Sequence, residues 1–222
     1  MTLLLGHCND EDMSRAFEII STAFGHEHPY IEFVYPLHDT PTGRANGAER
    51  LLATRRADPH TTFLKATDTG TGKIIGVAKW NVYNGVIPEE VRKLDGDYWS
   101  TEDERELAEW YVNDYLQLRR KAITDGGGNL VSLDLMCIDP DHQRQGAGTL
   151  LMQWGIEMAD KLGTKAVVES TTYGTRLYEN FGFSLEQHVT MEPPAKWALE
   201  DGSRTQKFLW MTRPAKTKTV AA

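Results

Sequence analysis

The sequence has few cysteines and no long apolar run. Its two cysteines, Cys8 and Cys137, can form at most one bridge, and neither lies in a C-x-x-C or Cys/His spacing typical of a metal site. The apolar run at residues 3–5 is too short for the core of a signal peptide, and no run approaches the ~20 residues that span a membrane. We therefore expect a cytoplasmic protein that has no membrane partner.

Positively charged residues are also fewer than negatively charged ones. The 222 residues include 24 lysines and arginines against 32 aspartates and glutamates, which gives a net charge of -8. A nucleic-acid-binding protein usually carries an excess of positive charge that neutralises phosphates, so we expect no nucleic-acid partner. An amine or another cationic partner fits this charge better. The length suits one domain with an insertion, and we expect a monomer or a homodimer.

Hydrophobic periodicity predicts helices and a hairpin in the N-terminal half. Apolar residues recur at helical spacing from Met13 to Phe24, with Asn9 and Asp10 as candidate caps. A change to β-rich runs around a Thr/Gly turn then indicates two antiparallel strands. The expected elements that follow the first helix are a second helix over 43–56, the hairpin over 61–83 and a helical insertion over 88–124.

The C-terminal half predicts two parallel strands that are joined by a helix. A strand over 130–138 is followed by a helix over 144–162 and a strand over 166–170, a length that requires a right-handed crossover. The fold class is therefore α+β, or mixed α/β, with a mixed sheet and helices on both of its faces. We expect one domain over 1–214 and a flexible tail over 215–222. The remaining expected elements are a short helix over 174–180 and strands over 183–190 and 206–212.

The stretch IDPDHQRQGAGTLLMQW places two glycines where the strand passes into the long helix. Backbone N–H groups from Arg144 to Thr149 lack partners within the helix, and the helix dipole favours anions at that end. Gly146 and Gly148 have no Cβ and would let a phosphate come close to these donors, while Gln143 and Arg144 can add side-chain donors. This turn therefore predicts a phosphate-binding site.

The spacing of this turn distinguishes between known phosphate-binding designs. A dinucleotide-binding G-x-G-x-x-G turn would need a small residue in place of Leu151, and a P-loop would need Gly-Lys-Ser/Thr. The pattern Q-x-x-G-x-G, from Gln143 to Gly148, instead resembles the acyl-CoA pyrophosphate loop of the GNAT superfamily of N-acetyltransferases. The later stretch TTYGTRLYENFGF resembles the second signature of that family, and the whole resembles fungal-type GNAT domain proteins. An ordinary Gly-rich turn before a core helix is the alternative.

The GNAT resemblance implies a mostly antiparallel central sheet and acetyl-CoA as the co-substrate, with no metal. It places the pantetheine arm along the strand at residues 136–138, where the amide of Ile138 would donate to the thioester oxygen as that oxygen becomes an oxyanion. Polar groups just after the second parallel strand would also hold the cofactor. The implied acetyl-CoA-binding residues are Met136, Cys137, Ile138, Gln143, Arg144, Gln145, Gly146, Ala147, Gly148, Thr149, Ser170 and Thr171.

Two catalytic roles are expected. The resemblance implies that Tyr178, in LYENFGF, protonates the leaving thiolate, whereas the alternative is a core tyrosine. Strand alternation places Asp134 on the same face as Ser132 and Met136, and Ser132 stands where some family members carry a glutamate base. Asp134 is then either the base, directly or through water, or a polar residue at a strand edge.

Three functions remain open at this stage. The first is direct acetyl transfer to a primary amine, on a small molecule or an exposed amino group. The second is a non-catalytic acyl-CoA-binding regulatory module, which the missing strand glutamate favours and Tyr178 opposes. The third is acetylation of a protein, with specificity in the insertion at 88–124. The HEHP stretch from His26 to Pro29 has no other ligand at a recognisable metal spacing, so surface or pocket-lining histidines are expected there.

Overall fold

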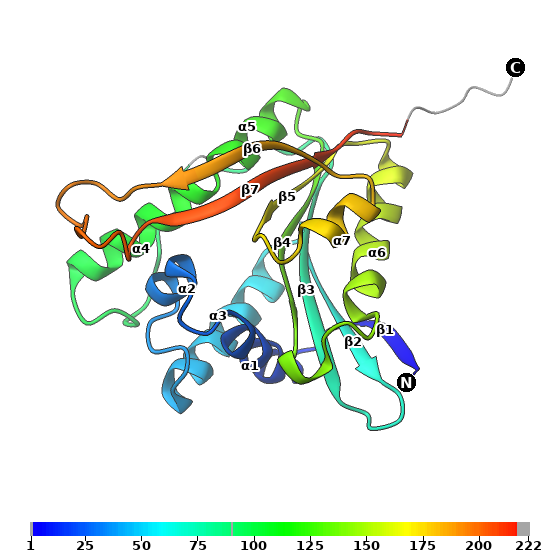
Figure 1. Cartoon of the computed structure of the whole chain (residues 1–222), viewed down its shortest axis with the longest axis horizontal. Helices are drawn as coiled ribbons and strands as arrows, with labels where there is room; N and C mark the ends of the chain where they lie inside the picture. The colour runs from blue at the N-terminus through cyan, green and yellow to red at the C-terminus, as the bar shows by residue number, and fades with distance from the viewer. Residues whose placement is uncertain (1, 90, 217–222) are drawn as a thin grey trace, which may run out of the picture.

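A computed structural model describes residues 2–89 and 91–216, and seven strands of this described chain form one sheet in the order β1-β2-β3-β4-β5-β7-β6 (Figure 1). Strands β4 (Leu130–Ile138) and β5 (Ala166–Ser170) are parallel, and the other neighbouring strands are antiparallel. The predicted mixed sheet with one parallel unit is therefore confirmed. Helices cover both of its faces, as the sequence predicts.

The N-terminal half contains the predicted helices and hairpin. Its elements are β1 (Leu3–His7), α1 (Met13–Phe24), α2 (Pro29–Val34), α3 (Pro41–Ala57), β2 (Thr61–Asp68) and β3 (Ile74–Tyr83). Helix α1 begins later than the predicted caps imply, because the residue directly before it is Asp12, and Asn9 and Asp10 lie in the turn that precedes it. Asn9 and Asp12 exchange side-chain to backbone hydrogen bonds, while Asp10 pairs with Arg55 and Arg56 of α3.

The predicted helical insertion over 88–124 is helical only in its second part. This second part consists of helices α4 (Glu102–Tyr115) and α5 (Gln117–Asp125). The described residues from 88 to 101 contain no helix. This coil is held on α4 through side chains. The Leu94 amide donates a hydrogen bond to Glu109 Oε1 at 3.0 Å, and the Arg92 amide donates one to Asn113 Oδ1 at 2.8 Å. In this coil, the amides of Arg92 and Leu94 donate to side chains of α4 and not to backbone carbonyls of the described residues in their own segment.

The C-terminal half matches the predicted order, with one shifted boundary. Its remaining elements are the 3-10 turn η1 (Pro140–His142), α6 (Ala147–Leu162), α7 (Thr175–Asn180), β6 (Ser184–Met191) and β7 (Gln206–Arg213). Helix α6 begins three residues later than predicted because Arg144 and Gly146 have positive φ angles of 58° and 93°. Lys216 pairs with Asp160 at 2.5 Å, and residues 217–222 of the predicted tail lie outside the described residues.

Close packing attaches α6 to the sheet. The indole of Trp80 in β3 is fully buried, and its Nε1 donates to the carbonyl of Leu151 at 3.2 Å. A Cβ added at Gly155 would lie 2.3 Å from this indole, so glycine is required for the approach. Helices α1 and α3 cover β2 to β4 on the opposite face, and α4 and α5 cover the strands toward β7. This arrangement places the N-terminus of α6 beside the end of β4.

Candidate functional site

The two parallel strands separate halfway along β4. Their pairing covers Val131 to Leu133 of β4 and ends at Val168 of β5, although β4 continues to Ile138. The amide of Asp139 donates to Ile75 of β3 at 2.8 Å. Because successive residues of a strand direct their N–H groups to opposite sides, the amides of Ile138 and Met136 point away from β3, into the gap that β5 leaves. The edge of β4 therefore presents hydrogen-bonding groups to this gap.

A β-bulge lies at the point where the strands separate. Lys79 of β3 pairs with Leu135, and the next residue, Trp80, pairs with Leu133, so Asp134 is the extra residue in β4. Leu133 and Met136 consequently pack in the same core cluster with α6, although they are three residues apart. The prediction that Asp134 shares a face with Met136 is wrong, because the bulge interrupts the alternation.

Asp134 instead belongs to a buried ionic network on the face that α5 covers. Its carboxylate pairs with Lys79 at 2.7 Å and with Arg119 of α5, and Arg119 also holds both oxygens of Glu169 in β5. Burial alone would raise the pKa of Asp134, but Lys79 and Arg119 hold that pKa well below its usual range. A carboxylate that two cations already hold is a poor acceptor for a further proton.

The turn before α6 presents free backbone donors. The first backbone bond across the start of the helix runs from Leu150 N–H to the Gly146 carbonyl at 3.0 Å, and no side chain caps the helix. The N–H groups of Ala147, Gly148 and Thr149 therefore have no acceptor within α6. Gly148 is also tight against α7, since a Cβ there would lie 3.1 Å from Leu177. The arrangement has the features of an anion site at a helix N-terminus.

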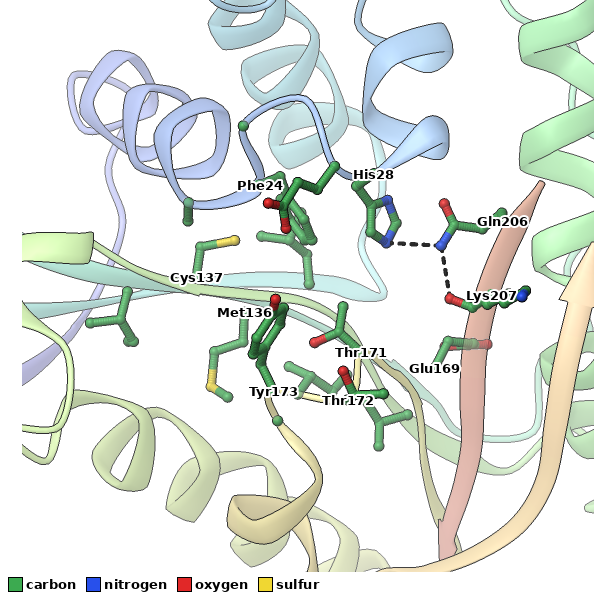
Figure 2. A pocket seen from close by; sticks show the side chains of 18 of the residues that line it. Phe24, His28, Met136, Cys137, Glu169, Thr171, Thr172, Tyr173, Gln206 and Lys207 are labelled. Atoms are coloured by element: carbon green, nitrogen blue, oxygen red, sulfur yellow. Dashed lines mark hydrogen bonds between the residues drawn. The ribbon is translucent and has the colours of Figure 1, made fainter. Parts of the chain in front are cut away.

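One cavity of about 1580 Å³ joins the turn to the gap between β4 and β5. Its walls are the loop between α1 and α2, the end of β4, the turn before α6, the start of α7, the end of β6 and the start of β7 (Figure 2). This volume exceeds the ~300–1,000 Å³ of a typical small-ligand pocket, so a long ligand and a second substrate can both fit. The site is thus built where the turn and the strand edge meet.

Most of the predicted cofactor residues line this cavity, and three do not. Ser170 is buried, and its hydroxyl donates to the carbonyl of Thr171 at 2.5 Å. Ala147 is buried in the core under α6, and Gln145 is exposed on the outside of the turn. The predicted residues that line the cavity are Met136, Cys137, Ile138, Gln143, Arg144, Gly146, Gly148, Thr149 and Thr171.

Tyr178 also lines the cavity, from α7. Its side chain is buried against Phe183 at a ring separation of 6.1 Å, and a Cβ at Gly174 would lie 2.5 Å from its ring. Burial raises the pKa of Tyr178 above its usual range, as it does the pKa of the nearby Cys137 thiol. Both groups therefore stay protonated at neutral pH, and the phenol keeps a proton to donate.

The opposite wall contains His28, one of the histidines expected at the surface or in a pocket, and Gln206, which the sequence did not identify. The Gln206 amide nitrogen donates to Nε2 of His28 at 3.3 Å and to the carbonyl of Lys207 at 2.9 Å, as Figure 2 shows. An amide nitrogen can only donate, so neutral His28 carries its proton on Nδ1, which is buried without a hydrogen-bond partner among the described residues. Burial lowers the pKa of His28 to about 4. The HEHP stretch was the available signal, but only the fold brings it to β7.

Comparisons with known proteins agree with this geometry. The family model described as "Acetyltransferase (GNAT) domain" matches residues 117–192, which include β4, the turn, α6 and α7. No curated protein sequence matches the chain. The family match shows that this part of the chain, about a third of its length, is similar to a GNAT acetyltransferase domain.

Solved structures across the whole chain share the fold at low sequence identity. A mosquito protein described as "arylalkylamine N-Acetyltransferase like 5b" has a TM-score of 0.64 at 14% identity, over 96% of this chain and 99% of that one. A Corynebacterium glutamicum protein described as "histone acetyltransferase HPA2 and related acetyltransferase" has a TM-score of 0.59 at 15% identity, over 99% and 100%. A Sinorhizobium meliloti phosphinothricin acetyltransferase, solved in complex with AcCoA, has a TM-score of 0.55 at 16% identity, over 100% and 93%.

Two further observations bear on the expectations from composition. Cys8 and Cys137 are both buried and unbridged in the described structure. None of the helices in the described ranges has the length and apolarity that a bilayer crossing requires.

Proposed function

We propose that this protein transfers an acetyl group from acetyl-CoA directly to a primary amine. The observation that carries the proposal is the single cavity that connects the free amides before α6 with the unpaired edge of β4 and with Tyr178. Phosphates would bind the turn, with Arg144 as a charged donor. The pantetheine arm would lie alongside β4 at Met136 to Ile138 as an added strand, as the GNAT resemblance implies.

The chemistry in this proposal needs an oxyanion donor and an acid. The amine nitrogen forms a bond to the thioester carbon, and the C–S bond then breaks. The Ile138 amide donates to the carbonyl oxygen while that oxygen carries negative charge. The hydroxyl of Tyr178 gives its proton to the departing sulfur, and the proton that the amine loses restores the phenol through water in the cavity. The products are the N-acetylated amine and CoA with a free thiol.

Of the two roles that the sequence left open for Asp134, this proposal does not use the base. Its contacts to Lys79 and Arg119 favour a positioning role, in which the carboxylate holds both cations and shapes the bulge where β4 leaves β5. Proton acceptance from the amine is then assigned to water. The acceptor would enter from the wall that contains His28 and Gln206, opposite the turn before α6.

Release of free CoA thiol in the presence of an amine panel tests the proposal. The panel contains polyamines, arylalkylamines, amino acids and peptides, of which arylalkylamines are suggested by the name of the mosquito protein. At least one class should give amine-dependent thiol release and an acetylated product of the expected mass. Binding of acetyl-CoA without turnover on any class would favour the second candidate, a non-catalytic acyl-CoA-binding regulatory module. The occupied carboxylate of Asp134 is the observation that favours that candidate.

A further inference from the structure

Three side chains that are spaced six residues apart meet beside the loop between α1 and α2. His26 lies in this loop, Glu32 in α2 and His38 in the turn that precedes α3. The Glu32 Oε1 lies 2.7 Å from Nδ1 of His26 and 3.0 Å from Nε2 of His38. These three ligand-type atoms all lie within 4.8 Å of one another.

The hydrogen bonds of Ser21 determine which nitrogen of His38 carries a proton. Ser21 Oγ lies 2.8 Å from the carbonyl oxygen of His38, which can only accept, so the single hydroxyl proton is used there. The same Oγ lies 3.0 Å from Nδ1 of His38 and must therefore accept from Nδ1–H. In the neutral ring, Nε2 then carries a lone pair that faces the negative oxygen of Glu32. The contact therefore needs a positive charge between the two atoms, either a proton that makes His38 an imidazolium or a metal ion in its place.

His26 has the same arrangement with a different partner. Its Nε2 lies 3.5 Å from Oδ2 of Asp39, and its Nδ1 faces Glu32. Each histidine therefore offers one nitrogen to the shared oxygen and has an acceptor on its other nitrogen. This is the pattern of metal-ligating histidines, whose second nitrogen donates to a carboxylate or another acceptor that fixes the tautomer. The His38 side chain is 1% exposed, so its orientation is held by packing as well.

We propose that His26, Glu32 and His38 bind a divalent zinc ion. Two imidazoles and one carboxylate are a known ligand set for zinc, which binds such groups at about 2.0–2.2 Å. Ligands of a tetrahedral ion are then about 3.3 Å apart, so the present spacing needs only small side-chain shifts. The carboxylates of Glu32 and Asp39 balance the two positive charges, and the fourth position, on the exposed side of His26, is left for water.

The zinc ion would join the end of α1, α2 and the turn before α3. The loop that holds His26 also forms one wall of the cavity, where Phe24 and His28 lie. Metal binding would stabilise the conformation of this wall. His26 itself lines the cavity, whereas none of the three ligands belongs to the turn before α6 or to β4.

Zinc titration of the full-length protein, stripped with a chelator and then freed of it, tests this site. In competition with a chromophoric chelator, the wild type should bind one equivalent of Zn²⁺, and Zn²⁺ should raise its Tm. Glu32→Gln keeps the size of the side chain and removes the anionic ligand, so it should weaken binding at least tenfold and abolish the rise in Tm. Ser21→Ala should weaken binding about 10–100-fold through the orientation of His38.

Two controls make the outcome specific. His188→Ala removes an exposed histidine on β6 and should leave zinc affinity unchanged. Mg²⁺, which prefers oxygen ligands, should not raise the Tm. Absence of a saturable zinc site in the folded wild type, or equal affinity in Glu32→Gln and the wild type, would overturn the proposal. Because both readouts are made without acetyl-CoA, they are separate from the proposed transferase activity.

Discussion

Arg119 in α5 and Glu169 in β5 form a two-point ion pair, and their side chains are 3% and 1% exposed. The third nitrogen of the guanidinium holds Asp134 at the bulge of β4. One arginine thus connects the two parallel strands just where they begin to separate. The insertion that carries α5 is therefore part of the structure that shapes the cavity.

The first prediction follows from this ion pair. Arg119→Met would leave Glu169 without its partner and Asp134 with one cation fewer, so we expect the free energy of unfolding to fall by about 3–5 kcal/mol. Urea denaturation at pH 7 measures the change. Lys121→Met, which removes an exposed pair with Asp125 from the same helix, should cost less than about 0.5 kcal/mol. Equal losses in the two variants would show that burial does not strengthen the Arg119 pairs.

The low pKa of Asp134 predicts how stability depends on pH. The folded-state pKa lies below the value of about 3.9 for an unfolded aspartate, so the carboxylate stabilises the fold above pH ~4. That contribution is lost as the pH falls below ~4, through the folded-state pKa. Asp134→Asn should therefore lower the free energy of unfolding by about 1–3 kcal/mol at pH 7, and less at pH 3. Urea denaturation of the wild type and Asp134→Asn at both pH values measures the difference in their free energies of unfolding. A difference that is larger at pH 3 than at pH 7 would contradict this prediction.

The contact between α6 and the sheet gives a third prediction. Gly155→Ala places a methyl group 2.3 Å from the fully buried Trp80 ring, and this overpacking should cost about 1–3 kcal/mol. Alanine gains up to about 1 kcal/mol of helix propensity, so the net loss should remain measurable by thermal unfolding. Gly70→Ala makes an ordinary contact of 3.5 Å with Asp68 and serves as the control. A Gly155→Ala protein as stable as the wild type would mean that the helix is not tightly seated there.

Tyr178→Phe tests the proposed acid. The ring volume stays and the proton donor is lost, so turnover on an active amine should fall by roughly 10²–10⁴ with little change in acetyl-CoA affinity. Tyr173→Phe removes the hydroxyl of a cavity-lining tyrosine that is 88% exposed, and it should keep most of the activity. Steady-state rates and acetyl-CoA titrations of both variants are needed. Near-wild-type turnover in Tyr178→Phe, with chemistry rate-limiting, would exclude the acid role.

The sequence was most informative where structure depends on local pattern. The limits of β4 and β5 follow from apolar runs between turn residues, and they agree with the prediction to the residue. The turn before α6 was predicted from the pattern Gln143 to Gly148 between a strand and a helical pattern. The residue at which the turn ends and α6 begins was not predicted. It depends on the positive φ angles of Arg144 and Gly146, which are a property of the folded loop.

Features that depend on partners distant in sequence were missed. The bulge at Asp134 arises from the way β3 pairs with β4, and no residue type within β4 predicts it. Strand alternation alone therefore placed Asp134 on the face of Met136, and it could not show the partners of Arg119, which lie 15 and 50 residues away.

The central claim is that acetyl-CoA binds with its phosphates on the turn before α6. Equilibrium titration of acetyl-CoA with the wild type, Arg144→Gln and Lys161→Gln tests it most directly. Arg144 is exposed on the cavity wall and Lys161 lies in the last turn of the same helix, so the two variants lose equal charge at opposite ends of α6. The account predicts saturable binding by the wild type and a roughly tenfold or greater loss of affinity in Arg144→Gln alone, since a charge-assisted hydrogen bond contributes ~1.5–3 kcal/mol. No saturable binding by the wild type, or equal affinity in all three proteins, would contradict it.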